Sequence, residues 1–97
     1  MNATVVTRVQ TGVRIEARLL NVLKALAALK GMTLGDLLEG IVLHAFEGEQ
    51  PFGAETLKQI SDLKKVYGLE LRARDSHQLV ETPPRKAAGA KAKRSTR

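Results

Sequence analysis

Polar side chains at alternate positions near the start of the chain form a row of hydrogen-bonding groups. Arg8, Gln10 and Arg14 share one parity, and Gly12 occupies the position between the last two. In an extended segment, side chains two residues apart lie on the same face, so these three would point the same way. A guanidinium can pair bidentately with guanine or phosphate, and a glutamine amide with adenine. The spacing therefore predicts a face that could read the edges of nucleic-acid bases, with Arg14 as the strongest candidate.

Further candidates for contact with an anion lie in the helices expected after this segment. Met32, Thr33 and Leu34 would begin the second helix, where backbone N–H groups and the helix dipole favour a phosphate. Arg18 and Lys24 lie in the first helix and could touch phosphates, although a charge on an exposed helix face is most often only solvated. Thr33 also has the side chain of an N-cap, whether or not an anion binds.

Residue types that support catalysis or metal binding are scarce. The chain has no cysteine, which excludes disulfides and thiolate metal sites. His44 and His77 are far apart, and no serine is placed beside a histidine and an acid. Segment 31–35 lacks the lysine of a phosphate-binding loop. We therefore expect no enzyme activity, no metal and no cofactor, and we expect His44 to be a packing residue.

The net charge of +6 is distributed unevenly over the 97 residues. The whole excess lies beyond the last proline, in a segment with these six bases and no acid: Arg85, Lys86, Lys91, Lys93, Arg94 and Arg97. Up to Lys30 five bases accompany one acid, whereas from Gly31 to Asp62 six acids accompany one base. Such a split predicts a basic face for a polyanion and an acidic face turned away from it.

The elements that must position these residues begin with a single predicted β-strand over residues 4–15. The segment is rich in β-branched residues. Its odd-numbered positions include Val13 and Ile15, which would lie on the face opposite the polar one. No second strand of comparable quality follows, so the backbone donors and acceptors of this strand need a partner. We expect that partner to be a second copy of the chain.

Three helices are expected after the strand. The first begins at about Glu16 and ends at Gly31, which can take the left-handed conformation that terminates a helix. The second covers about 34–47 and the third ends at Gly68. The apolar positions assigned to a dimer core are Val13, Ile15, Leu19, Leu23, Leu26, Leu37, Leu38, Ile41, Val42 and Phe46.

The order of strand, helix, short turn and helix resembles the ribbon-helix-helix superfamily of repressors, antitoxins and plasmid partition proteins. The resemblance covers about 40 residues and rests on segment 13–16 at the strand end, the helix stop at Gly31 and the second helix capped by Thr33. It implies a mainly α fold with one short β-strand per chain. In that fold an intertwined homodimer pairs its two strands as an antiparallel ribbon, with an accessory third helix added here.

The resemblance also implies how DNA would be bound. In this family the outward face of the ribbon enters the major groove, and the start of the second helix holds a phosphate. Gly12 departs from the family's pattern, because a base-reading side chain is usual at that position. This departure puts strong sequence specificity in doubt.

The expected organisation has five segments. They are a flexible N-terminus (1–7), a dimerisation and DNA-binding unit (8–48), an accessory helix (52–68), an irregular segment (69–84) and a disordered basic tail (85–97). The tail could add a weak, salt-dependent attraction to DNA.

The expected function is that of a cytoplasmic, homodimeric DNA-binding protein that regulates transcription as a repressor does, by inserting paired strands into the major groove. No apolar run approaches the roughly 20 residues that span a bilayer, so no membrane association is expected. Two alternatives stay open. One is an antitoxin-like interaction module that holds a protein partner through Phe52 to Tyr67, and the other is an architectural protein that coats DNA with little sequence preference.

Overall fold

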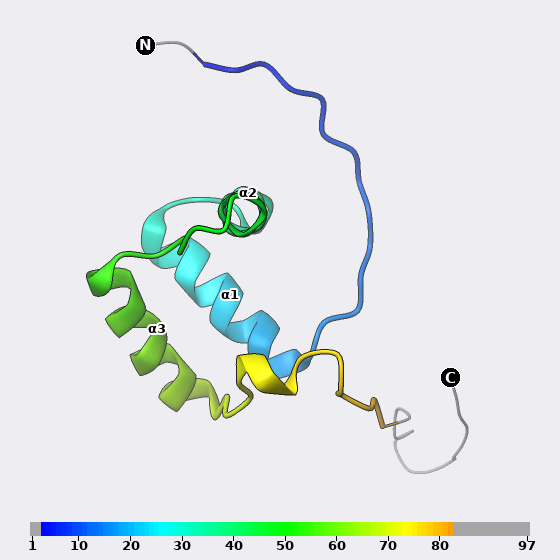
Figure 1. Ribbon diagram of the computed structural model, residues 1–97, viewed down its shortest axis with the longest axis vertical. Coiled ribbons are helices and arrows are strands. Elements are labelled where there is room, and N and C mark those ends of the chain that lie inside the picture. Colours follow the sequence, from blue (N-terminus) through cyan, green and yellow to red (C-terminus); the bar gives the residue numbers. More distant parts are fainter. Residues whose placement is uncertain (1–2, 83–97) are drawn as a thin grey trace.

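Three α-helices and one turn of 3-10 helix make up the described part of the chain. The structure is a computed structural model that describes residues 3–82. The elements are α1 (Ala17–Lys30), α2 (Leu34–Phe46), α3 (Ala54–Tyr67) and the 3-10 turn η1 (Ala73–Asp75). The fold is mainly α, with α1 between the other two helices (Figure 1). The predicted basic tail lies outside the described residues.

The helix boundaries follow from local capping. The Glu16 side chain accepts a hydrogen bond from the backbone N–H of Leu19 at 2.8 Å and so begins α1. Gly31 ends α1 with φ of 69°, a conformation that costs glycine little because it has no Cβ. Thr33 Oγ1 accepts from the N–H of Asp36 at 3.0 Å and caps α2. The predicted helices, with their ends at Gly31 and Thr33, are confirmed to within a residue or two.

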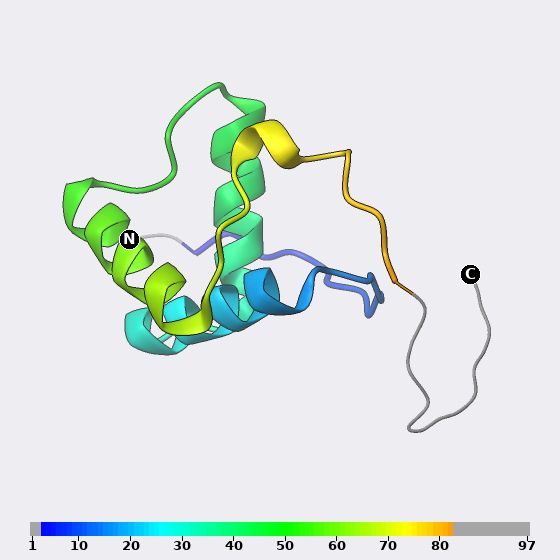
Figure 2. The ribbon, with the colours of Figure 1, turned by 90° about the horizontal axis from the view of Figure 1, so that it is seen from below.

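Helix α1 lies antiparallel to α3, and polar contacts join the two helices at both ends. Lys30 at the end of α1 donates to Thr56 Oγ1 at 2.5 Å, and Arg18 near its start donates to the carbonyl of Gly68 at 3.3 Å. Helix α2 instead runs across α1 (Figure 2). Because α1 contacts both neighbours, it is the helix on which the others are assembled.

The core forms where the three helices meet on α1. Leu26 is only 2% exposed and packs with Ala27 and Leu37. Five partly buried side chains surround this cluster, namely Leu23, Ile41, Phe52, Ile60 and Leu63. Burial of such apolar surface is the main favourable term in folding. Helix α3 supplies two of these side chains, so it belongs to the core of the single chain and is not merely added to it.

The predicted β-strand is wrong. Residues 3–15, called the N-terminal arm below, form neither helix nor strand and make no backbone hydrogen bond within the described residues. Figure 1 shows the arm leading away from the helices. β-branched residues favour an extended backbone, but a strand also needs a neighbour to complete its ladder, and residues 3–82 provide none. The expected ribbon-helix-helix fold, with its two-stranded ribbon and intertwined dimer, is therefore contradicted.

The position of Leu26 leads to a stability prediction. We expect Leu26→Ala to lower the free energy of unfolding by about 2–5 kcal/mol, because it leaves a cavity between α1 and its neighbours. Leu29→Ala on the same helix removes a side chain that is 56% exposed and should cost less than about 1 kcal/mol. Urea unfolding followed by circular dichroism measures both. Equal losses in the two variants would contradict this assignment of the core.

Candidate functional site

The four positions predicted to read bases lie on the N-terminal arm. All four are exposed: Arg8, Gln10, Gly12 and Arg14. No regular strand forms there, so a face shared by these even-numbered positions stays a prediction. The structure thus places all four positions on one exposed segment that has no backbone bond to the helices.

The two arginines of the arm pair with carboxylates far away in the sequence. Arg8 donates through Nε to Glu39 Oε2 and through Nη2 to Glu39 Oε1, both at 2.7 Å. Arg14 forms an ion pair with Glu81. The arm is therefore attached to α2 near one end and to the segment after η1 near the other.

These two ion pairs are exposed and exchangeable. The side chains of Arg8 and Glu39 retain 63% and 43% of their accessible surface. Exposed pairs contribute little to stability, because water and salt screen them and two long side chains must be ordered. Either guanidinium can therefore leave its carboxylate for another anion without unfolding the helices.

Hydrogen bonding lowers the pKa of two carboxylates, Glu39 and Glu16. The bidentate bond from Arg8, aided by its positive charge, lowers the pKa of Glu39 below its ordinary value. The pKa of Glu16 is also lowered, first by the backbone N–H of Leu19 and then by the hydrogen bond from Arg18. Both groups therefore stay ionised to lower pH than a free glutamate would.

At the predicted phosphate site at the start of α2, some backbone N–H groups are already bonded and a negative charge lies nearby. The N–H of Met32 already donates to the carbonyl of Ala27 at 3.0 Å, and Thr33 caps the helix. Leu34 is half-buried at the first helical position. Asp36 in the first turn adds negative charge beside the same N–H groups, which opposes a second anion there. Phosphate binding at this helix end stays a prediction.

The two cations predicted to touch phosphates from α1 differ in their surroundings. Arg18 donates to Glu16 at 2.8 Å and to the carbonyl of Gly68 at 3.3 Å, so it ties the start of α1 to the end of α3. Lys24 is exposed and has no ion pair within residues 3–82. Arg18 thus has a structural role, whereas the role predicted for Lys24 is untested.

The ten positions assigned to a dimer core fall into three groups. Two of them are buried in the single chain, Leu26 and Leu37. Four are half-buried, Ile15, Leu23, Leu38 and Ile41. Four are exposed, Val13, Leu19, Val42 and Phe46. The exposed group lies on the arm, at the start of α1 and along α2.

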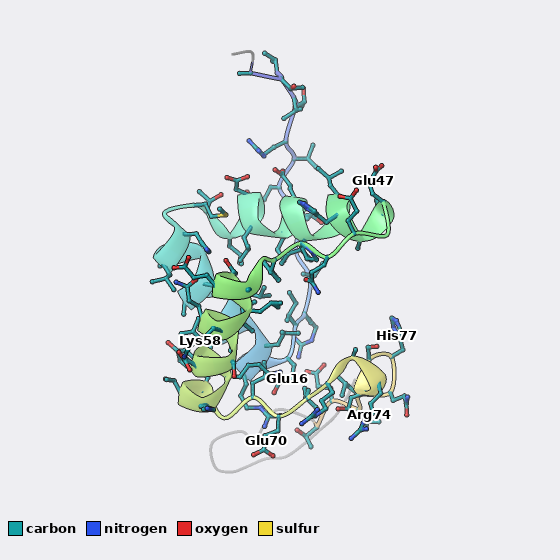
Figure 3. The ribbon with its side chains drawn as sticks, turned by 60° about the vertical axis from the view of Figure 1, so that its left-hand side comes forward. Glu16, Glu47, Lys58, Glu70, Arg74 and His77 are labelled. Carbon is teal, nitrogen blue, oxygen red and sulfur yellow. The ribbon has the colours of Figure 1, made fainter. Side chains whose placement is uncertain are left out.

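Several charged residues were not singled out from the sequence, because only the fold brings them into position. Glu39 and Glu81 hold the arginines of the arm, and the sequence separations of 31 and 67 residues gave no signal for either pair. Lys64 and Arg72 line a groove beside α3 that depends on the chain reversing after Tyr67. Figure 3 shows Glu70 at this end of the molecule and Glu47 at the opposite end.

Residues 3–82 contain neither a cluster suited to a metal ion nor a helix able to span a membrane. Among residues 3–82, no three histidine or carboxylate side chains are grouped so that they could hold a metal ion. Over the same residues, no helix has the length and apolar character needed to cross a membrane.

Comparison of the chain with known protein families, with curated proteins and with solved structures found no match. The resemblance to ribbon-helix-helix proteins therefore rests on the sequence pattern alone. The arm, its two ion pairs and the groove beside α3 are the features from which a function can be argued.

The pairing of Arg8 with Glu39 leads to a prediction about pH. Because the pKa of Glu39 is lowered by the pairing, the bond is complete above the ordinary pKa of glutamate and is lost as pH falls through the lowered value. We expect Arg8→Ala to return the titration of Glu39 to the ordinary range of a glutamate. Carbon-13 NMR of the Glu39 carboxyl group measures this change.

Arg18→Ala is the matched control for this experiment. Arg18 pairs with Glu16 and makes no contact with Glu39, so its loss should leave the titration of Glu39 unchanged. An unaltered Glu39 titration in the Arg8→Ala variant would show that the arm does not dock on α2.

Proposed function

We propose that the chain is a homodimeric protein without enzyme activity that binds double-stranded DNA in the cytoplasm and regulates transcription. The observation that supports this proposal is the N-terminal arm, which carries Arg8, Gln10 and Arg14 on an exposed segment without backbone bonds to the helices. Guanidinium and amide groups are the side chains that most often contact guanine, adenine and phosphate.

The arm would act on DNA as a single extended segment and not as part of a ribbon. Arg14 is six positions after Arg8, which is about 20 Å of extended backbone. That length equals about six base-pair steps of about 3.4 Å. One arm is thus long enough to follow a DNA groove and to place a guanidinium at each end of that span. N-terminal arms of this kind contact DNA grooves in other DNA-binding domains.

DNA would replace the carboxylates that hold the arginines in the free protein. Glu39 and Glu81 each accept from an exposed guanidinium, and such pairs are easily exchanged. A duplex offers a row of phosphates and guanine edges, and its binding releases condensed counterions. The exchange therefore favours DNA most at low ionic strength.

An apolar patch on α2 supports self-association. Leu43 and Phe46 are 62% and 81% exposed, and Val42 is exposed beside them. Phe46 follows Leu43 by three residues and Val42 by four, so it neighbours both on the helix surface, and the three form one patch, called the α2 patch below. A contiguous exposed apolar patch favours burial against a partner. A second copy supplies an identical patch about a two-fold axis and brings a second arm to the DNA.

DNA binding is tested with labelled random duplexes titrated by wild type, Arg8→Ala and Arg14→Ala at several salt concentrations. The slope of log affinity against log salt should become shallower by about 0.9 for each phosphate contact removed. Lys58→Ala is the matched control, because Lys58 is exposed on α3 and pairs with Asp62. It should leave the slope almost unchanged.

Glu39→Gln gives a change of opposite sign. It removes the carboxylate that competes for Arg8, so DNA should bind more tightly in this variant than in wild type. The arm is not the DNA contact if a chain ending at Thr82 loses binding while both arginine variants keep it. A large preference for one sequence over random DNA would separate a regulator from a DNA-coating protein.

Self-association is tested by sedimentation of wild type and Phe46→Ser at micromolar concentration. Burial of one phenylalanine contributes about 1.5–3 kcal/mol, and a symmetric dimer loses it twice. We therefore expect the dissociation constant to rise by at least about a hundredfold in Phe46→Ser. Leu29→Ser, which alters an exposed leucine of α1, is the control. A wild-type chain that sediments as a monomer would contradict the homodimer.

A further inference from the structure

A groove of about 840 Å3 lies between α3 and the segment that follows it. Its apolar lining comes from Leu57, Ile60 and Leu69, of which Leu69 is buried. Its cationic lining comes from Lys64, Lys65 and Arg72. A volume of this size is typical of sites that take several side chains or a sizeable ligand.

The walls of the groove are fixed by the fold. Gly68 has φ of 66° and turns the chain after α3, so that Leu69 and Arg72 line the groove together with the helix. Arg18 of α1 donates to the carbonyl of Gly68 at 3.3 Å. Beyond the reversal, the N–H of Arg72 donates to Asp75 Oδ2 at 2.8 Å and begins η1. Because both walls are held by these bonds, the groove exists before any ligand arrives.

The charge of the groove is largely uncompensated. Within residues 3–82, none of the three cations of the lining forms an ion pair. Glu70 is the single acid among the lining residues. Two of the cations, Lys64 and Lys65, lie in the last turn of α3, where they also offset the negative end of the helix dipole. Lys65 and Arg72 are exposed and Lys64 is half-buried, so three cations lie together beside an apolar surface.

We propose that this groove binds an acidic amphipathic segment of a partner protein. Apolar side chains of the partner would cover Leu57 and Ile60, and its carboxylates would pair with the three cations. A DNA backbone fits the groove less well, because phosphates and sugars offer no apolar side chains for its floor. The groove shares no residue with the N-terminal arm. The proposal therefore goes beyond the proposed function and is tested independently of it.

The test uses the full chain and a fluorescent helical peptide of about 18 residues, with leucine at every third or fourth position and glutamate between them. A peptide with glutamine in place of each glutamate is the charge control. We expect the glutamate peptide to bind at least about tenfold more tightly than the glutamine peptide at low salt. Fluorescence polarisation measures both affinities.

Variants then locate the binding. We expect the double variant Lys64→Glu and Lys65→Glu to weaken binding of the glutamate peptide by about tenfold or more. Leu57→Ser should weaken it as well, because Leu57 lies in the apolar floor. Lys58→Glu, on the same helix but outside the groove, should have little effect. Circular dichroism checks folding, and Arg72→Glu replaces the double variant if α3 is destabilised, because Arg72 precedes η1 and lies outside the α-helices.

Three results would overturn the proposal. The first is no binding of the glutamate peptide, and the second is equal weakening by Lys58→Glu and the groove variants. Equal weakening would mean that the peptide responds to overall charge and not to the groove. The third is a duplex that displaces the peptide and loses affinity in the groove variants, which would make the groove a nucleic-acid contact.

Discussion

The packing of α1 between α2 and α3 is the constraint on which the rest of the structure depends. Leu26 is buried where the three helices meet, and polar contacts join α1 to α3 at both ends. Because α1 is held in this way, its first turn is fixed as well, and that turn sets where the N-terminal arm leaves the helices. The same first turn carries Arg18, which anchors the reversal at Gly68 and so one wall of the groove.

The helices could be predicted from the sequence because local interactions determine them. Apolar residues recur at helical spacing, Gly31 permits the left-handed end of α1, and the Thr33 side chain accepts from a free N–H in the first turn of α2. The arm could not be predicted in the same way. Its β-branched residues indicate an extended backbone, but whether that backbone pairs depends on a neighbour that local sequence does not specify.

The candidate site was predicted only in part, for a related reason. The two arginines and the glutamine of the arm could be singled out because they occupy alternate positions, which is a local property of the sequence. Their partners Glu39 and Glu81 are 31 and 67 residues away, so only the three-dimensional arrangement reveals them. The groove likewise depends on how far the chain turns back after α3. The charges along the sequence predicted a basic segment up to Lys30 and an acidic segment from Gly31 to Asp62. The ion pair between Arg8 and Glu39 connects these two segments.

The ion pair between Arg14 and Glu81 brings the C-terminal end of the arm close to the end of the described chain. The sequence continues from Thr82 into a segment with six basic residues and no acid beyond the last proline. The N-terminal arm and this basic sequence are thus joined to the helices at neighbouring points. If the arm binds DNA as proposed, tethering would raise the effective concentration of the basic sequence around the same stretch of duplex, as in a bivalent ligand.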